Sequence, residues 1–415
     1  MINSSLHPAD ALVLMMERIY KRGLTTTSGG NLSILDDNGA IWITPSGIDK
    51  GSLRREDISL VKNDGTIIGR HKPSVELPFH KLVYEKRPDL RAVVHAHPPN
   101  LVAFSVVRKI PNLSLCGWMS KLCGSVGYTD YAVPGSVLLG ENIAQEFAKG
   151  YDIIVLENHG VCAGGTDIFE AYKKFEALEH AAQIEINAGK IGKLQQLDVS
   201  LTHKPTLSRL RGHISSEGSC KSSGAKELVS IIKRSYEQRL FTTTSGTISY
   251  RIDDNNFLIN STDSDPQNIY EDELILVGIK EGAKSKDNVI KLHSDLYTEN
   301  PWINSIIKAT PPNAMAFAVS DAAFDLRTIP ESIIVLRGVN TLTDKQYLKD
   351  SITKETPVVI CKNDFVLAVG ETLIKAFDRI EVIEATAKSI ILAKDLGNLV
   401  NISDKQVQEI KAAFN

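Results

Sequence analysis

Two histidines separated by a single residue are the first feature of this chain that could do chemistry. The apolar segment that leads into them is typical of a strand, and side chains alternate between the two faces of a strand. His95 and His97 therefore project from the same face, and Pro98 and Pro99 end the strand directly behind them. Two imidazoles presented together predict half of a metal site, which needs one or two further ligands.

A third histidine lies where core packing does not explain it. His159 occupies the turn Asn158-His159-Gly160, between two apolar runs at 151–156 and 161–165. A turn beside a glycine offers little packing to an imidazole, so we expect this side chain to serve chemistry. His159 is the candidate for the third metal ligand.

A carboxylate precedes these histidines in a segment with helical spacing. The pattern at 72–84 predicts a helix capped by Ser74, which puts Glu76 in the first turn. A carboxylate in that position is often simply a favourable partner for the helix dipole, so its role stays open at this point. His80 follows one turn later, and we interpret it as a structural residue.

Two short polar loops have the composition of phosphate-binding segments. One is the glycine-containing turn at 23–34, in which Ser28 and Asn31 supply neutral donors. The other contains Ser46 and Gly47, after a strand that ends at about residue 44. Plain turns would have the same composition, so both interpretations stay open at this point.

The elements that must position these residues alternate between strands and helices. Helical spacing is found at 101–107 and 167–187, a hairpin turn is predicted at 63–66, and the segment 110–140 is rich in loop residues. A ligand-bearing strand followed by a helix is typical of layered α/β proteins.

The composition is that of an ordinary globular protein. A length of 415 residues predicts two or three domains, and the net charge of −3 predicts neither a nucleic-acid nor a membrane partner. The apolar start at 1–23 carries acidic residues at helical spacing, so it predicts an amphipathic helix and not a signal peptide. Five scattered cysteines indicate reduced thiols in a cytoplasmic protein.

The second half repeats the first in the same order. Three segments carry the repeat: 241–249 echoes 24–33, 308–319 echoes 95–106, and 358–370 echoes 153–165. Three echoes in one order argue for a tandem duplication. The predicted organisation is a domain at 1–202 with an intact metal site, a linker at 203–222 rich in Ser, Gly and basic residues, and a degenerate domain at 223–415.

The replacements in the second half remove the metal ligands. Lys308, Thr310 and Asp364 stand where the three histidines stand in the first half, and Asp295 falls near the counterpart of Glu76. A lysine facing the site disfavours a dication, so we predict that the second half has lost the metal and kept the fold.

Six short motifs occur in order over about residues 8–190: TSGGN at 27–31, ITPSG at 43–47, KPSVELPFH at 72–80, VVHAHPPN at 93–100, YAVPGS at 131–136 and ENHGV at 157–161. In these motifs the chain resembles the class II aldolase/adducin family, and within it the aldolases of sugar 1-phosphates. The likeness of residues 225–400 is weaker and lacks the metal histidines.

The resemblance implies a fold and a reaction. It implies two tandem copies of a three-layer α/β/α domain, with zinc or another divalent metal held by His95, His97 and His159 and with Glu76 as the acid/base. The reaction implied is C–C bond cleavage or formation in a ketose 1-phosphate through a metal-stabilised enediolate. The residues implied to hold the phosphate are Ser28, Asn31, Ser46, Gly47 and Ser74.

Two departures from the family pattern concern the substrate. The second serine before the glutamate is Val75 here, which leaves only a backbone donor for the phosphate. The approximate counterpart of a tyrosine that handles the aldehyde end is Leu115, for which Tyr128 or Tyr131 are the candidate substitutes.

Alternatives stay open on the same scaffold. An epimerase or a decarboxylase would use the same enediolate chemistry, although glutamate at position 76 favours aldol cleavage. An adducin-like interaction protein without catalysis is the alternative from another class. The resemblance also implies a homo-oligomer, and the duplication suggests a dimer that mimics a tetramer, with the second half lending residues to the site of the first.

Overall fold

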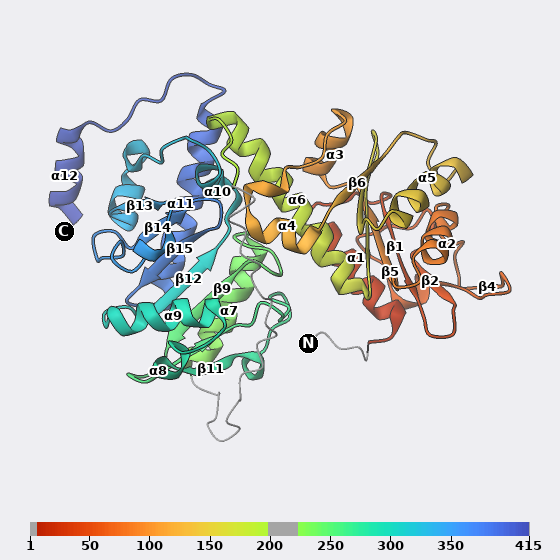
Figure 1. Cartoon of the computed structure of the whole chain (residues 1–415), viewed down its shortest axis with the longest axis horizontal. Helices are drawn as coiled ribbons and strands as arrows, with labels where there is room; N and C mark the ends of the chain where they lie inside the picture. Colours follow the sequence, from red (N-terminus) through yellow and green to blue (C-terminus); the bar gives the residue numbers. More distant parts are fainter. Residues whose placement is uncertain (1–5, 198–222, 415) are drawn as a thin grey trace. The chain divides into compact units, whose positions relative to one another are not determined.

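The computed structural model describes residues 6–197 and 223–414, so the predicted linker at 203–222 lies outside the described part (Figure 1). The chain divides into two compact units, each built on one β-sheet. The first comprises Ile2–Leu113 with Met119–Gln183, and the second comprises Ser114–Trp118 with Ile184–Asn415. Among the described helices, none is long and apolar enough to cross a membrane.

The first unit contains an eight-stranded mixed sheet in the order β4-β3-β2-β1-β5-β8-β7-β6. Its strands are β1 (Asn31–Leu35), β2 (Ile41–Ile43), β3 (Ser59–Val61), β4 (Ile67–Ile68), β5 (Ala92–Ala96), β6 (Val126–Thr129), β7 (Ile153–Leu156) and β8 (Gly160–Gly165). All neighbours pair antiparallel except β6 and β7, which pair parallel. The strand predicted to carry the histidine pair, β5, is therefore enclosed between β1 and β8.

Helices cover both faces of this sheet. They are α1 (Pro8–Lys21), α2 (Leu77–Lys86), α3 (Pro99–Val106), α4 (Gly117–Cys123), α5 (Val137–Ala148) and α6 (Ile168–Ile191). Apolar side chains of α2 and α5, among them Phe79, Val83 and Phe147, form one core with inward residues of the central strands. Helix α1 packs outside that core, against β1 and β2. Prolines occupy the first turns of α1, α2 and α3, where the missing N–H costs no hydrogen bond.

The expectation of a loop-rich segment at 110–140 was partly wrong. This segment includes α4 and β6, and β6 adds a parallel edge strand next to β7. Each element is only seven or four residues long, so neither shows a clear hydrophobic period in the sequence. They form because their buried side chains, such as Met119, Cys123 and Thr129, find partners in the fold.

The second unit has the same topology. Its seven strands follow the order β11-β10-β9-β12-β15-β14-β13, which is the order of the first sheet without its edge strand β4. The strands are β9 (Thr247–Arg251), β10 (Asn256–Ile259), β11 (Ile275–Gly278), β12 (Ser305–Ala309), β13 (Val339–Leu342), β14 (Val358–Cys361) and β15 (Phe365–Gly370). The helices are α7 (Ser223–Glu237), α8 (Ile279–Gly282), α9 (Asn288–Glu299), α10 (Pro312–Ala318), α11 (Leu373–Ala393) and α12 (Asp404–Phe414). The predicted duplication is confirmed at the level of topology.

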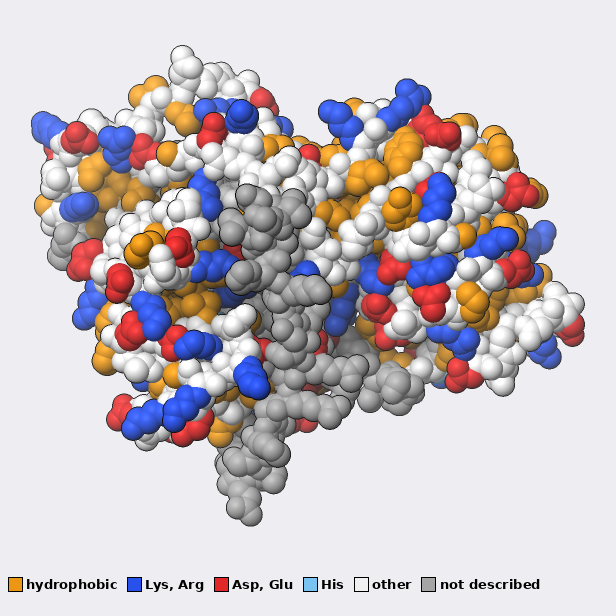
Figure 2. Space-filling view, in the orientation of Figure 1, with side chains coloured by type: hydrophobic (Ala, Val, Ile, Leu, Met, Phe, Trp, Pro, Cys, Tyr) orange, Lys and Arg blue, Asp and Glu red, His pale blue; other side chains and the backbone are white. Residues whose placement is uncertain are grey.

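The distribution of surface charge and the state of the cysteines agree with the small net charge and the scattered cysteines of the sequence. Figure 2 shows basic and acidic side chains interspersed over the visible face, without a large area of one sign. The four cysteines among the described residues are buried and form no disulfide.

Both units contain the same buried polar set. In the first unit the Ser33 hydroxyl lies 2.6 Å from His80 Nδ1 and 2.6 Å from the Tyr84 hydroxyl. In the second unit Ser249 lies 2.7 Å from His293 Nδ1 and 2.7 Å from the Tyr297 hydroxyl. Burial lowers the pKa of His80 and that of His293 to about 3. Each imidazole is therefore neutral in the folded protein and joins the sheet to a helix.

The low pKa of His293 predicts an acid-dependent loss of stability. Between pH 6.5 and 3 the unfolded chain binds a proton at this residue that the folded chain does not, so stability falls as the pH falls, by about 1.4 kcal/mol per pH unit. His293→Phe should lower stability at pH 7, because two hydrogen bonds are lost, and should reduce this slope. Urea unfolding of both proteins at pH 6.5 and pH 4.5 measures the slope. Equal slopes would show that His293 does not resist protonation.

Candidate metal centre

His95 is held in the centre of the first sheet. It lies on β5 with no exposed surface, and the ring of Phe79 from α2 packs edge-on against its imidazole. Its Nδ1 lies 3.0 Å from the Val161 carbonyl oxygen, to which it donates. This hydrogen bond fixes the ring and leaves the Nε2 lone pair for a metal ion.

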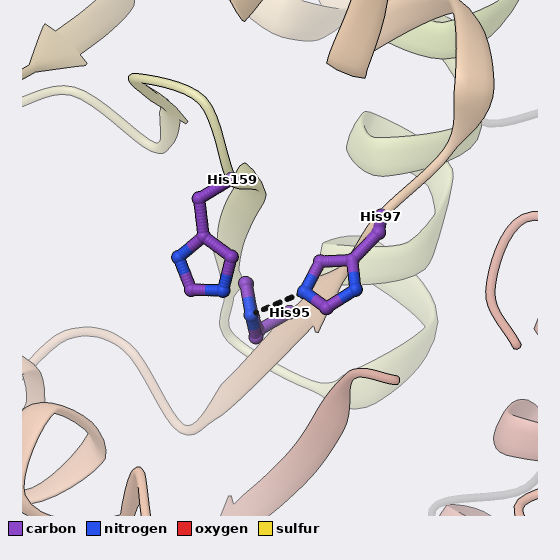
Figure 3. A group of neighbouring side chains, drawn as sticks. All are labelled: His95, His97 and His159. Carbon is purple, nitrogen blue, oxygen red and sulfur yellow. Dashed lines mark hydrogen bonds between the residues drawn. The ribbon is translucent and has the colours of Figure 1, made fainter. Parts of the chain in front are cut away.

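His97 and His159 complete a cluster around His95 Nε2. His97 follows β5 directly, and its Nε2 lies 3.2 Å from His95 Nε2. His159 lies in the turn between β7 and β8, where Asn158 takes the left-handed conformation with φ of 54°. The ring centres are 4.9–5.0 Å apart, and each ring offers a nitrogen atom within 4.8 Å of the others (Figure 3). The predicted set of three imidazoles is thus brought together.

The environment keeps all three rings neutral. Burial, and then the neighbouring rings, hold the pKa of His95 well below its usual value. Burial likewise lowers the pKa of His97 and of His159, while the Glu76 carboxylate opposes the shift at both. A neutral imidazole is the form that binds a metal ion.

Glycines allow the close approach of the loops that enclose this cluster. Gly30, with φ of 72°, lies so close to the strand that a Cβ would be 2.7 Å from the His95 carbonyl oxygen. At Gly160 a Cβ would be 2.5 Å from the Ala96 carbonyl oxygen and 2.7 Å from the His97 ring. Any larger residue at either position would push the ligand strand away from its neighbours.

Glu76 lies beside the three imidazoles, at the start of α2. Its Oε2 is 3.3 Å from His95 Nε2, and its Oε1 is 3.8 Å from His159 Nε2. Although Oε1 is buried, it makes no hydrogen bond within the described residues. The helix begins later than expected: Glu76 is the N-cap residue, and the Ser74 hydroxyl accepts the Glu76 backbone N–H at 3.2 Å. The predicted cap at Ser74 was therefore wrong, because residues 74–76 form a turn that precedes the helix.

The donor set fits a divalent metal ion. Three neutral nitrogens converge with a carboxylate next to them, and the buried nitrogen Nδ1 of His159 and oxygen Oε1 of Glu76 have no hydrogen-bond partner in the described structure. Three histidines with room for further ligands are typical of a catalytic site, whereas structural zinc sites have four protein ligands.

The loops predicted to hold a phosphate lie together next to the cluster. Asn31 is 4 % exposed, and its amide is engaged by Glu76, with Asn31 Nδ2 2.7 Å from Glu76 Oε2. The Ser46 N–H donates to the Lys72 carbonyl, and the Ser74 N–H donates to the Thr44 carbonyl, so these two segments run side by side. Ser28 and Gly47 are exposed and their side-chain positions are open to solvent. Their role toward a phosphate stays a prediction.

Lys50 is a residue of this region that the sequence reasoning missed. It is 3 % exposed, its N–H donates to the Thr27 carbonyl at 2.9 Å, and its Nζ donates to the Pro45 carbonyl. Burial lowers its pKa to about 8, and within the described residues it pairs with no carboxylate. The ammonium group therefore contacts the residue before Ser46, and the Lys50 backbone contacts the residue before Ser28. The signal in the sequence was its position four residues after Ser46, within the same loop.

Two residues of the motif at 131–136 lie near Glu76. A shallow depression of about 150 Å³ is lined by Glu76, Pro78, Phe79, Gly135, Ser136, Leu139 and Gly140. Tyr131 is 55 % exposed, the Tyr128 hydroxyl is buried without a hydrogen bond, and Leu115 is buried. Within the described residues, no contact joins any of these three side chains to the histidines. The roles expected of Tyr128 and Tyr131 therefore stay predictions.

The second sheet carries other residues at the equivalent positions. Strand register aligns His95 with Lys308, because they pair with Asn31 and Thr247 on one side and with Cys162 and Leu367 on the other. The Lys308 Nζ lies 4.7 Å from the Phe365 ring centre, and burial lowers its pKa. Asp364 pairs with Lys345, and the Thr310 hydroxyl is 2.7 Å from that of Ser245.

The register also corrects the counterpart of Glu76. The Ser–His–Tyr sets align His80 with His293, so the residue four positions earlier, Glu76, aligns with Val289. Asp295 lies two residues after His293 and pairs with Lys291 and Lys349, so the expectation that it stands near the counterpart of Glu76 was wrong.

Comparison with known proteins agrees with these motifs. The model of the family described as "Class II Aldolase and Adducin N-terminal domain" matches residues 10–186 and, again, residues 226–391. The chain belongs to the class II aldolase and adducin family. Both units are therefore copies of the family domain, and the predicted likeness of the second half is confirmed together with that of the first.

The following alignments each cover less than half of this chain and most of the other protein. An L-fuculose phosphate aldolase of Methanococcus maripaludis is 39% identical over 166 residues, which are 40% of this chain and 89% of the relative. A 3-oxo-tetronate 4-phosphate decarboxylase of Haemophilus influenzae is 31% identical over 185 residues, with 44% and 88% covered. A solved structure of L-fuculose 1-phosphate aldolase aligns with a TM-score of 0.44 and 29% identity, covering 49% of this chain and 94% of its own.

The geometry predicts about one tightly bound metal ion per chain, held by the first unit. His97→Ala should remove it, because two imidazoles do not make a catalytic site. Thr310→Ala, the change at the equivalent position of the second unit, is the matched control and should leave the metal content unchanged. Elemental analysis by mass spectrometry after dialysis measures both. Two ions per chain, or full occupancy in His97→Ala, would contradict the site.

Proposed function

We propose that this chain is a metal-dependent aldolase that cleaves or forms a C–C bond next to the carbonyl of a sugar phosphate of the ketose 1-phosphate type. The observation that carries this proposal is the position of Glu76. A buried carboxylate lies within 3.3–3.8 Å of two of the three imidazoles, with one oxygen atom engaged and the other without a hydrogen bond. That arrangement suits a group that exchanges a proton with a substrate bound at the metal centre.

The metal would be held by His95, His97 and His159, and zinc is the ion that three neutral imidazoles favour. When bound there, a divalent ion supplies a Lewis acid that polarises the substrate carbonyl and stabilises the negative charge that develops on its oxygen. The protein contributes the orientation of the ligands, chiefly through the Val161 carbonyl behind His95.

Glu76 would move the proton. In aldol cleavage the hydroxyl group at the breaking C–C bond loses a proton, and the carbanion-like carbon next to the carbonyl gains one before product leaves, so no net proton is taken up. Glu76 Oε1 is the group placed to take up a proton and pass it to that carbon, while Oε2 is held by the Asn31 amide at 2.7 Å.

The phosphate part of the proposal is supported by Lys50. A buried ammonium group without a carboxylate partner is costly, and an anion bound at the adjacent loops of Ser28 and Ser46 would compensate its charge. This cation offsets the loss of a hydroxyl at Val75, whose side chain is 66 % exposed and offers no donor.

A decarboxylase is the second candidate, because a relative 31% identical to the chain is a 3-oxo-tetronate 4-phosphate decarboxylase. Loss of carbon dioxide also leaves a carbanion next to a carbonyl, and the same residues would serve it. An epimerase would use them too.

The retention of three ligands, the carboxylate and Lys50 in one unit supports an enzyme over an interaction protein without catalysis. Homo-oligomerisation and the tetramer-like dimer stay predictions, which light scattering tests.

A panel of ketose 1-phosphates and 3-oxo-acid phosphates tests the reaction. The metal-loaded wild-type protein should release dihydroxyacetone phosphate from at least one ketose 1-phosphate. Glu76→Gln should lower kcat by about 10²–10⁴-fold at unchanged metal content, because the amide cannot carry the proton. Release of carbon dioxide alone, or epimerised product alone, would replace the aldolase proposal with the corresponding alternative.

Removal of the buried cation tests the phosphate. Lys50→Met should raise KM for the phosphorylated substrate by about 10–100-fold with a smaller effect on kcat, because a charge-assisted contact contributes about 1.5–3 kcal/mol. Lys62→Met, at an exposed position of the nearby hairpin, is the control. Calorimetry with inorganic phosphate gives the same comparison without turnover. Equal KM values and equal phosphate binding in both variants would exclude a role for Lys50.

A further inference from the structure

A line of buried polar side chains leads from the core of the first unit to Glu76. The Tyr84 hydroxyl lies 2.6 Å from Ser33 Oγ, and Ser33 Oγ lies 2.6 Å from His80 Nδ1. His80 Nε2 lies 2.5 Å from Asn31 Oδ1, and Asn31 Nδ2 lies 2.7 Å from Glu76 Oε2. All five residues are buried, so water does not compete for these hydrogen bonds.

The proton positions along this line follow from its two ends. A carboxylate accepts only, so the Asn31 NH₂ group donates to Glu76 and the Asn31 oxygen faces His80. His80 must then donate from Nε2 and accept at Nδ1 from the Ser33 hydroxyl. Ser33 in turn accepts from the Tyr84 hydroxyl, which burial keeps protonated by raising its pKa. Every donor therefore points toward the carboxylate.

A reversed Asn31 amide would break this order. Its oxygen would face Glu76 Oε2, and two acceptors would lie 2.7 Å apart without a proton between them. The Nε2–H group of His80 is what selects the correct orientation, because it needs an acceptor and not a second donor. Neutral His80 meets this requirement, and burial lowers its pKa to about 3.

The second unit supplies an internal comparison. Ser249, His293 and Tyr297 repeat the Ser–His–Tyr part with hydrogen bonds of 2.7 Å. Thr247 takes the place of Asn31, 3.2 Å from His293 Nε2, and Val289 takes the place of Glu76. The Ser–His–Tyr set is thus a feature of the fold in both copies, and its connection to a carboxylate exists only where the metal ligands exist.

We propose that His80 is a positioning residue for the acid/base group: with Ser33 it orients the Asn31 amide so that Glu76 Oε2 is held and Glu76 Oε1 stays available to substrate. This inference rests on the proposed role of Glu76 in the reaction. It assigns a role in catalysis to a histidine that touches neither metal nor substrate, and it gives Asn31 a partner other than the phosphate.

Two substitutions at His80 separate orientation from packing. Gln places its Nε2 donor near the position of the imidazole Nε2, so His80→Gln keeps the contact to Asn31. Asn reaches only the position of Nδ1, so His80→Asn keeps the contact to Ser33 and loses the one to Asn31. The matched control is His293→Asn, which removes the equivalent donor in the unit without ligands.

With the substrate identified by the panel, His80→Asn should lower kcat by about 10–100-fold, at a KM and metal content close to wild type. His80→Gln should recover at least a third of the wild-type kcat. His293→Asn should lower the melting temperature by a similar amount to His80→Asn and leave kcat unchanged. Equal kcat in His80→Asn and His293→Asn, or no recovery in His80→Gln, would overturn the proposal.

A spectroscopic measurement keeps the proposal testable if the variants fold poorly or if the reaction is another one. The ¹⁵N chemical shifts of His80 in the wild-type protein should report the neutral Nε2–H tautomer from pH 5 to 8. An Nδ1–H tautomer or a protonated ring would overturn the proton order, whatever the substrate. If the tautomer is as expected but no aldol cleavage is found, the assignment of the reaction fails and the orientation of Glu76 stands.

Discussion

Keeping three imidazoles neutral and close together inside the fold is the constraint on which the rest of the first unit depends. Each ring would repel the others if protonated, and burial removes the water that would stabilise the charge, so both effects lower the pKa of His95. The arrangement needs a strand in the middle of the sheet to carry His95, a tight turn to bring His159, and glycines at 30 and 160 that let the neighbouring backbone approach. The carboxylate of Glu76 then adds a negative charge beside the rings.

The comparison of the two units separates the fold from its chemistry. Both keep the strand order, the Ser–His–Tyr set, and a glutamate that binds the first turn of the helix after the ligand strand, Glu179 at Asn100 and Glu384 at Asn313. Only the first unit keeps the residues that face the metal centre. In the second, the Lys308 ammonium stands at the His95 position and lies over the Phe365 ring. A cation of the protein itself at that position disfavours a metal ion by charge repulsion.

The histidine cluster that could hold a metal ion was predictable from the sequence, because each of its residues carries a local signal. The i, i+2 spacing of His95 and His97 requires only a strand to put them on one face, and His159 requires only a turn beside glycine. The repeat was visible because three segments recur in order. Short elements such as α4 and β6 could not be predicted, because seven or four residues do not establish a period and their formation depends on tertiary contacts. The counterpart of Glu76 was misplaced because residues 285–292 match none of residues 72–79, and the hydrogen bonds of the two Ser–His–Tyr sets fix the alignment.

The sequence by itself determined which side chains can bind a metal ion, which half retains them, and which family the motifs resemble, since these depend on residue types and spacing along one strand or turn. The tertiary structure decided what those residues contact. It placed Asn31 against Glu76, buried Lys50 beside the Ser46 loop, and connected His80 to Glu76 through the Asn31 amide. Such contacts join residues up to 49 positions apart, and the pairing of strands and the packing of α2 bring them together, so no local pattern encodes them.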